Sequence, residues 1–400
     1  MKRKTFIIIV LTFVFPLLGI GFANAGEVRG VTKNAITVGI VLDITGPFAN
    51  DMVPMLEGYK TYLSYVNDRG GIHGRKVKAI VEDSRYAIPL SISAFKKLVF
   101  RDGVLAILGL TGTGHVLALE RQIQKEKVPV ISISLSDTMA IPLKRYVFMP
   151  SASYQDEVKV IIDYIMKDLK AKEPRIAFIS FDIEFGKVCF EAAQKQANLY
   201  GLKIHKEIIS PGALEATSQV LNLKKYKPDF TILHTGIAST VAIFRDAKKL
   251  KLPGAFIATY WAVNEEILNM AGKAAREYIG VHSFNAWYED TPGMAELRKM
   301  TLKYHPGTEK PYRPRGYTQA WISSMLLTKG LEKAGENPNS ETLVDGLERI
   351  RDLDTQGLCG HISFSSTNHK ASEYCRMYKG DVDKGIFRPI TDWISPAKER

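Results

Sequence analysis

The sequence predicts an α/β protein of two lobes, each a doubly wound, mostly parallel sheet flanked by helices. The chain has 400 residues, which is more than one hydrophobic core usually supports. Short β-branched runs alternate with longer amphipathic runs, as in βαβ units. The stretches DITG (43–46) and DIEFG (182–186) each follow a predicted strand, and this weak repeat favours two similar lobes.

Residues 1–25 have the layout of a secretory signal peptide. Three basic residues at 2–4 precede an apolar run over 6–22, and Ala23 and Ala25 supply small residues at the expected cut. A proline and two glycines within the run weaken the alternative, an uncleaved membrane anchor. We therefore expect cleavage after Ala25 and an exported mature protein.

A first doubly wound unit is expected from residue 35 onward, because buried-strand patterns alternate with apolar residues at helical spacing. Its expected strands are 35–43, 76–83, 104–110 and 128–134, and its helices include 51–68 and 114–127.

A second unit of the same kind begins near Ser153. Its expected strands are 175–182, 203–210, 229–236, 255–260 and 277–284, between helices at 152–171, 186–201 and 239–251. Three helices without an intervening strand follow at 293–304, 314–334 and 340–352, and strand-like alternation returns from Gly357.

This order of elements predicts a chain that crosses between the lobes three times. Lobe 1 would comprise 26–153 and 285–355, and lobe 2 would comprise 154–284 and 356–392. Three connecting segments form a hinge that bends while it keeps the lobes together.

Composition and motifs argue against several function classes. The formal net charge is +12 at pH 7, or +9 without the basic residues at 2–4, but no block of five Lys or Arg occurs, so no nucleic-acid partner is expected. Strong hydrolase, NTPase, zincin and redox signatures are missing. His115 could serve as the base of an exported α/β enzyme, although a lone histidine in a first helical turn is more often a satisfied polar residue. Without paired histidines, no metal or other cofactor is expected, and we predict a protein that is not an enzyme.

Two hydroxyl-rich loops, TGTGH (111–115) and SISLSDT (132–138), follow consecutive predicted strands. Ligands of open parallel sheets bind at the carboxyl ends of strands, where helix N-termini present unpaired N–H groups. Together the loops suit a carboxylate held by neutral donors, although helix caps and turns explain either loop alone. The hydroxyls belong to Thr111, Thr113, Ser132, Ser134 and Ser136.

Large aromatic residues lie near other strand ends, where flanking Gly, Asp and Pro indicate loops. A large ring is unfavourable when exposed, so we expect these rings to clamp an apolar part of the ligand. They are Phe48, Tyr86, Phe185, Tyr260 and Trp261.

The three cysteines and two C-terminal histidines carry structural expectations. Cys359 and Cys375 flank a predicted hairpin, so a local disulfide is expected between them. Cys189 lies on an amphipathic helix and is expected to be a buried thiol. His361 and His369 are expected at the surface.

Several stretches together carry a family resemblance that extends over nearly the whole mature chain. The most specific is the N-x-x-G-G-I-x-G turn at 67–74; the others are ITVGIVLDITGPFA (36–49), LGLTGTGHVLAL (108–119), VPVISISLSD (128–137), RIAFISFDIEFG (175–186), YKPDFTILHTG (226–236) and GYTQAWISSMLLTKGLEKAG (316–335). The sequence resembles the periplasmic substrate-binding proteins of branched-chain amino acid ABC transporters, the leucine/isoleucine/valine-binding type. This resemblance implies the type I periplasmic binding fold, a periplasmic location, a small carboxylate ligand and ABC permease subunits as partners.

The resemblance also implies roles for individual residues. Thr113 would bind the ligand carboxylate, with Ser134 and Ser136 as its partners, and Phe185 would close over the ligand from the second lobe. Gly236, at the end of strand 229–236, also falls at the expected site.

The acid that binds an α-ammonium group in this family would fall near Tyr260, where this sequence has no Asp or Glu. Either Glu184, Asp137 or Asp43 supplies the charge, or the ligand is an apolar or aromatic carboxylate without an ammonium group. The same fold could also serve a membrane receptor as a ligand sensor.

Overall fold

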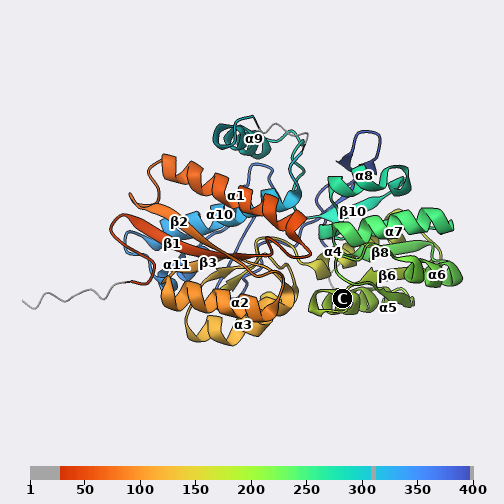
Figure 1. Cartoon of the computed structure of the whole chain (residues 1–400), viewed down its shortest axis with the longest axis horizontal. Coiled ribbons are helices and arrows are strands. Elements are labelled where there is room, and N and C mark those ends of the chain that lie inside the picture. The colour runs from red at the N-terminus through yellow and green to blue at the C-terminus, as the bar shows by residue number, and fades with distance from the viewer. Residues whose placement is uncertain (1–27, 308–311, 397–400) are drawn as a thin grey trace, which may run out of the picture.

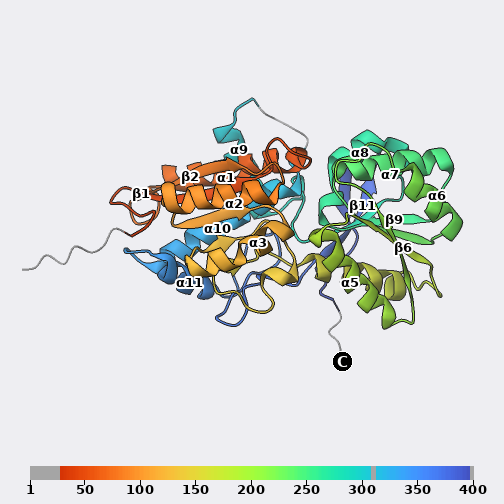
Figure 2. The same ribbon diagram turned by 60° about the horizontal axis from the view of Figure 1, so that its bottom comes forward.

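The computed structural model describes residues 28–307 and 312–396, which form two lobes lying side by side (Figure 1). In the turned view of Figure 2 the lobes remain adjacent, with the chain passing between them. The predicted signal peptide, residues 1–25, lies outside the described residues.

Lobe 1 is built on a parallel sheet with strand order β2-β1-β3-β4-β5. Helices α1 and α10 pack together on one face, and α2 and α3 pack together on the other (Figure 1). The strands are β1 (Ala35–Leu42), β2 (Lys76–Asp83), β3 (Ala106–Leu110), β4 (Val130–Ile131) and β5 (Val147–Phe148). The helices are α1 (Ala49–Asp68), α2 (Ile88–Lys96), α3 (Thr113–Lys125), α9 (Pro292–Tyr304), α10 (Arg315–Ala334) and α11 (Ser340–Glu348).

Lobe 2 contains a sheet with strand order β12-β11-β10-β9-β8-β6-β7. Its strands are β6 (Ile176–Ser180), β7 (Ile204–Ile208), β8 (Phe230–His234), β9 (Ala255–Ala258), β10 (Ile279–His282), β11 (Arg376–Asp381) and β12 (Ile386–Pro389). Its helices are α4 (Tyr154–Asp163), α5 (Glu184–Asn198), α6 (Thr217–Tyr226), α7 (Ile237–Leu250) and α8 (Glu265–Ala271). The pairs of β11 are antiparallel, because this strand returns from lobe 1 at the end of the chain.

Local chemistry fixes the point where the chain enters lobe 2. The Ser153 hydroxyl accepts the Asp156 N–H, and the Asp156 carboxylate accepts the Ser153 N–H, each at 3.0 Å. This capping box satisfies two N–H groups at the start of α4. It therefore begins that helix directly after the crossing from β5.

The last crossing lies later in the sequence than we expected. Residues 356–392 were assigned to lobe 2, but Lys370 pairs with Met149 beside β5. The rings of Phe364 and His369 also pack on Phe148, with centroids 5.2 and 3.9 Å away. Alternating apolar residues suit an edge of either sheet, so the pattern alone did not indicate which lobe they cover.

Two expectations for this C-terminal segment are wrong. His369 is fully buried rather than exposed, with Nδ1 3.1 Å from the Val147 carbonyl and Nε2 3.1 Å from Glu348. The disulfide is not formed: all three cysteines are free, and Cys359 pairs with Phe284 whereas Cys375 pairs with Ile394. Cys189 is a buried thiol on α5, as expected.

Across the described ranges, no helix combines the length and the apolar character needed to cross a membrane.

Candidate ligand-binding site

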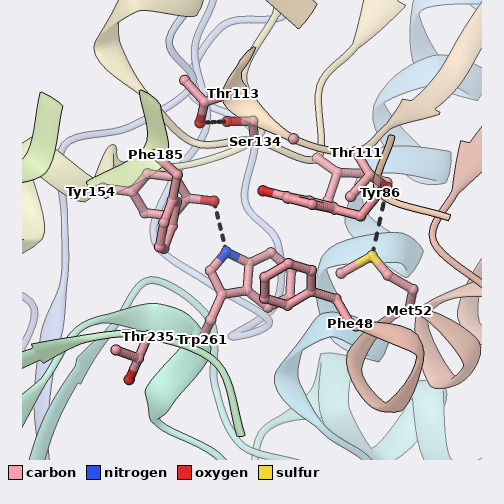
Figure 3. Close-up of a pocket in the computed structure, with 12 residues that line it drawn as sticks. Phe48, Met52, Tyr86, Thr111, Thr113, Ser134, Tyr154, Phe185, Thr235 and Trp261 are labelled. Atoms are coloured by element: carbon pink, nitrogen blue, oxygen red, sulfur yellow. Dashed lines mark hydrogen bonds between the residues drawn. The ribbon is translucent and has the colours of Figure 1, made fainter. Parts of the chain in front are cut away.

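A cavity lies between the two lobes, at the carboxyl ends of their strands (Figure 3). It is small, with a volume of about 30 Å³, which is more than the roughly 10–15 Å³ that one water molecule needs. Both lobes contribute to its wall, which consists of Phe48, Met52, Tyr86, Thr111, Gly112, Thr113, Ile133, Ser134, Tyr154, Phe185, Thr235 and Trp261.

One corner of the cavity is polar. The hydroxyls of Thr113, the first residue of α3, and Ser134, which follows β4, lie 2.6 Å apart (Figure 3). Gly112 precedes α3 with φ +93° and offers no side-chain cap, so the first N–H groups of α3 face this corner uncapped. A Cβ at Gly112 would lie 2.8 Å from the His115 ring, so the turn requires glycine. Hydroxyl donors and a helix N-terminus together favour an anionic group here.

Tyr86 adds a further hydroxyl, which Figure 3 shows pointing into the cavity. Its ring lies 4.4 Å from the ring of Phe48, centroid to centroid. Both Arg85 and Tyr86 have positive φ, +48° and +52°; the Asp83 carboxylate holds this turn by accepting the Arg85 N–H at 3.0 Å. Left-handed backbone at successive non-glycine residues is strained and is often found at functional sites.

The rest of the wall is mainly aromatic. Trp261 donates its indole N–H to the Tyr154 hydroxyl at 2.8 Å, which fixes both rings (Figure 3). The Tyr154 and Phe185 rings meet edge to face, 5.1 Å apart. A satisfied Trp–Tyr pair leaves mostly apolar ring surface toward a ligand.

Two other hydroxyls in the wall have protein partners. Thr111 donates to the Val41 carbonyl at 3.1 Å, which ties it back to β1. Thr235 lies 2.7 Å from the Thr240 hydroxyl, and Figure 3 shows its side chain turned away from the rings. Because the uncapped N-terminus of α3 lies beside Thr113 and Ser134, the polar corner is the main candidate for an anion.

No Asp, Glu, Lys or Arg of the described residues lines this cavity. The Asp43 carboxylate accepts the N–H groups of Gly46 and Phe48, at 2.6 and 2.8 Å, and so shapes the loop that carries Phe48. Lys370 donates to the Asp137 carboxylate at 3.1 Å. Glu184 lines an adjoining groove and not the cavity itself. The three acids weighed as partners for an ammonium group thus lie outside the cavity wall.

Sequence reasoning missed a fourth acid nearby. Asp51, on α1, is buried and lines a small neighbouring cavity that shares Trp261 with the first. Burial raises the pKa of Asp51 to about 8. In the sequence it resembled any polar residue in the first turn of a helix.

Three more of the predicted site residues do not line the cavity. The Ser136 hydroxyl accepts a hydrogen bond from the Gln155 amide at 3.1 Å and caps a short turn. Tyr260 is buried behind the wall and donates its hydroxyl to Gln319. Gly236 precedes α7, and a Cβ there would lie 3.1 Å from the Phe48 ring, so it borders the wall at the contact between lobes.

The wall also contains residues that sequence reasoning did not single out: Met52, Ile133, Tyr154 and Thr235. Met52 and Ile133 follow the apolar periodicity of a helix and a strand, which is indistinguishable from ordinary core. Tyr154 directly follows the Ser153 cap at the crossing between the lobes. Its place at this crossing could have identified it as a residue of the cavity wall.

The structure gives His115 a structural role. Its Nδ1 lies 2.8 Å from the Ser91 hydroxyl, and burial lowers the pKa of His115 to about 4. It is therefore neutral at pH 7 and paired with Ser91 rather than with Thr113. Within residues 28–307 and 312–396, no group of three or more His, Cys, Asp or Glu side chains is placed to hold a metal ion.

Known proteins share this architecture over nearly their whole length. "Leu/Ile/Val-binding protein homolog 3" of Brucella melitensis is 22% identical over 369 residues, covering 91% of this chain and 95% of that protein. The structure of a branched-chain amino acid ABC transporter protein from Thermus thermophilus with bound valine superposes with a TM-score of 0.85 at 22% identity, covering 92% of this chain and 98% of that one. A fatty acid ABC transporter substrate-binding protein from Thermomonospora curvata gives a TM-score of 0.84 at 21% identity, covering 92% and 94%.

These likenesses establish the type I periplasmic binding protein fold that the two hinged sheets had indicated. The model of the periplasmic binding protein family matches residues 35–385. The chain therefore belongs to the periplasmic binding protein family.

Proposed function

We propose that this protein is the substrate-binding subunit of an ABC importer and carries a small carboxylate with an apolar or aromatic body and no α-ammonium group. The observation that carries the proposal is the composition of the cavity. Neutral donors gather in one corner, at Thr113 and Ser134, and the opposite wall consists mainly of aromatic rings without a charged side chain.

The charge balance separates this ligand class from ordinary amino acids. The positive end of α3 and the one hydroxyl proton that the Thr113–Ser134 hydrogen bond leaves free stabilise a carboxylate. An ammonium group enclosed without a counter-charge or sufficient hydrogen bonds would lose several kcal/mol. The relatives include a structure with bound valine and one described as a fatty acid transporter's protein, so the fold accommodates bodies of different size and polarity.

Closure of the lobes is the step that the ligand would drive. Thr113, Ser134 and Phe48 belong to lobe 1, and Phe185 and Trp261 belong to lobe 2. A ligand that first binds the polar corner gains the contacts of the second lobe only in the closed form, and this difference shifts the equilibrium toward closure. The closed form would then dock on the permease in the periplasm, after removal of residues 1–25.

A thermal-shift screen tests the proposed ligand class. The panel would contain aliphatic and aromatic monocarboxylates, the corresponding α-amino acids, amines and sugars. A ligand at about 100 times its Kd adds roughly 2.7 kcal/mol to the free energy of unfolding, so monocarboxylates should raise the melting temperature clearly. A larger shift with α-amino acids than with the matching monocarboxylates, or stabilisation by sugars or amines with no response to any carboxylate, would refute the proposal.

A further inference from the structure

A second hollow adjoins the candidate site on the side of α3 and α5. Its volume is about 610 Å³, and Tyr86 and Phe185 line both it and the inner cavity. We call this hollow the outer groove. The two shared residues come from different lobes, so the outer groove is a continuation of the cleft.

The wall of the outer groove is largely apolar on both sides. Lobe 1 contributes Pro47, Ile88 and Pro89, and lobe 2 contributes Ile183 and Pro211. Ile88 is 40% exposed, so its side chain is accessible to a ligand in the groove. An apolar chain placed between these side chains would remove its own surface and theirs from water.

Gly114 keeps the outer groove open because it has no side chain. A Cβ at this position would lie 3.7 Å from Ile88 Cδ1 and 3.8 Å from Glu184 Cβ, which belong to opposite lobes. Larger side chains at 114 would project into the same space. Gly114 is the second residue of α3, directly after Thr113, so the polar corner and the outer groove adjoin along one helix.

The charge of the outer groove is also one-sided. Glu184 lines it, His115 is neutral at pH 7, and no Lys or Arg of the described residues belongs to its wall. A second carboxylate at the distal end of a ligand would face Glu184 without a cationic partner.

We propose that the outer groove holds the apolar tail of the ligand, whose carboxylate lies at Thr113 and Ser134 and whose chain passes between Tyr86 and Phe185. The ligand class is then a monocarboxylic acid with a chain longer than a branched-chain amino acid side chain. This inference rests on the proposed function and extends it from a carboxylate to a long-chain one.

Calorimetry with butanoate, hexanoate, octanoate and decanoate tests the inference. Each methylene buried in the outer groove should tighten binding about fourfold, from about 0.8 kcal/mol per CH₂. Butanoate is the shortest acid of the series and places the least chain in the outer groove, so its binding tests the proposed function. If butanoate binds and the longer acids bind no more tightly, the inference is overturned and the proposed function stands. If no acid of the series binds, both fail.

Two variants test whether the tail of the ligand lies in the outer groove. Gly114→Leu should abolish the gain beyond butanoate by filling the space between Ile88 and Glu184, and it should also weaken butanoate itself, because the larger side chain hinders closure of the lobes. Ile88→Asp, at the exposed first residue of α2, should reduce the gain in affinity with chain length by adding a charge to the wall. This variant adds no bulk, so its effect does not depend on the lobes closing around a larger side chain. An undiminished gain in both variants would overturn the assignment.

Octanedioate provides a test of the distal end. It should bind more weakly than octanoate, and Glu184→Gln should narrow the difference. Equal affinity of the wild-type protein for the two acids would show that the distal end does not reach Glu184 and would overturn the proposed path of the tail.

Discussion

Replacing Thr113 with valine probes the polar corner with almost no change of shape. Thr113 is 1% exposed, and its hydroxyl lies 2.6 Å from that of Ser134. A hydrogen bond to a charged group contributes about 1.5–3 kcal/mol, so Thr113→Val should raise the Kd of a bound carboxylate roughly 10- to 150-fold. Thr113→Ser retains the hydroxyl and is the matched control, with a Kd close to that of the wild type.

The same series has a second readout in the unligated protein. Thr113→Val leaves the buried Ser134 hydroxyl without its partner, which should lower the free energy of unfolding by about 1–3 kcal/mol. The double variant with Ser134→Ala should be destabilised by less than the sum of the single variants, because it leaves neither hydroxyl unpaired. Isothermal calorimetry with octanoate and urea denaturation measure the two effects. An unchanged Kd in Thr113→Val would refute the placement of the carboxylate.

Three further predictions concern the boundary between the lobes. Arg315 and Glu265 form a buried ion pair at 3.2 Å. Arg315→Met should therefore lower the free energy of unfolding by about 3–5 kcal/mol, and adding Glu265→Gln should recover part of this loss. Additive losses of the two variants in urea denaturation would contradict this reasoning. The pKa of Asp51 is raised to about 8 by burial, above an unfolded value of about 3.9. Between about pH 4 and 8 only the native state holds this proton, so this group makes the free energy of unfolding fall by about 1.4 kcal/mol per pH unit as the pH rises. Asp51→Asn should flatten the slope of the free energy of unfolding against pH. An unchanged slope would argue against the raised pKa. Gly236→Ala places a methyl group 3.1 Å from Phe48 and should weaken carboxylate binding severalfold in calorimetry by hindering closure, whereas an unchanged Kd would mean that the ring yields freely.

Much of the fold was predictable because buried parallel strands and amphipathic helices have distinct periods. The polar corner was predictable for a related reason. Thr113 and Ser134 follow consecutive strands of a parallel sheet, so the topology places them together. Phe48, Tyr86, Phe185 and Trp261 lie in the cavity wall for the same reason.

The remaining errors have identifiable physical causes. Ser136 carries the same hydroxyl as Ser134. It lies two residues later, where the chain turns, and its hydroxyl accepts a hydrogen bond from Gln155. Tyr260 and Trp261 are adjacent and equally aromatic; one faces Gln319 and the other the cavity. Such choices depend on side-chain partners from distant parts of the chain, which a single sequence does not reveal.

The central claim concerns a cavity wall that binds a carboxylate and gives an ammonium group no carboxylate partner. The most direct test compares 4-methylpentanoate with leucine, which differ by that one group, in calorimetry at pH 7. An unpaired ammonium costs several kcal/mol, so the acid should bind at least about 100-fold more tightly. Equal affinity, or tighter binding of leucine, would contradict the account.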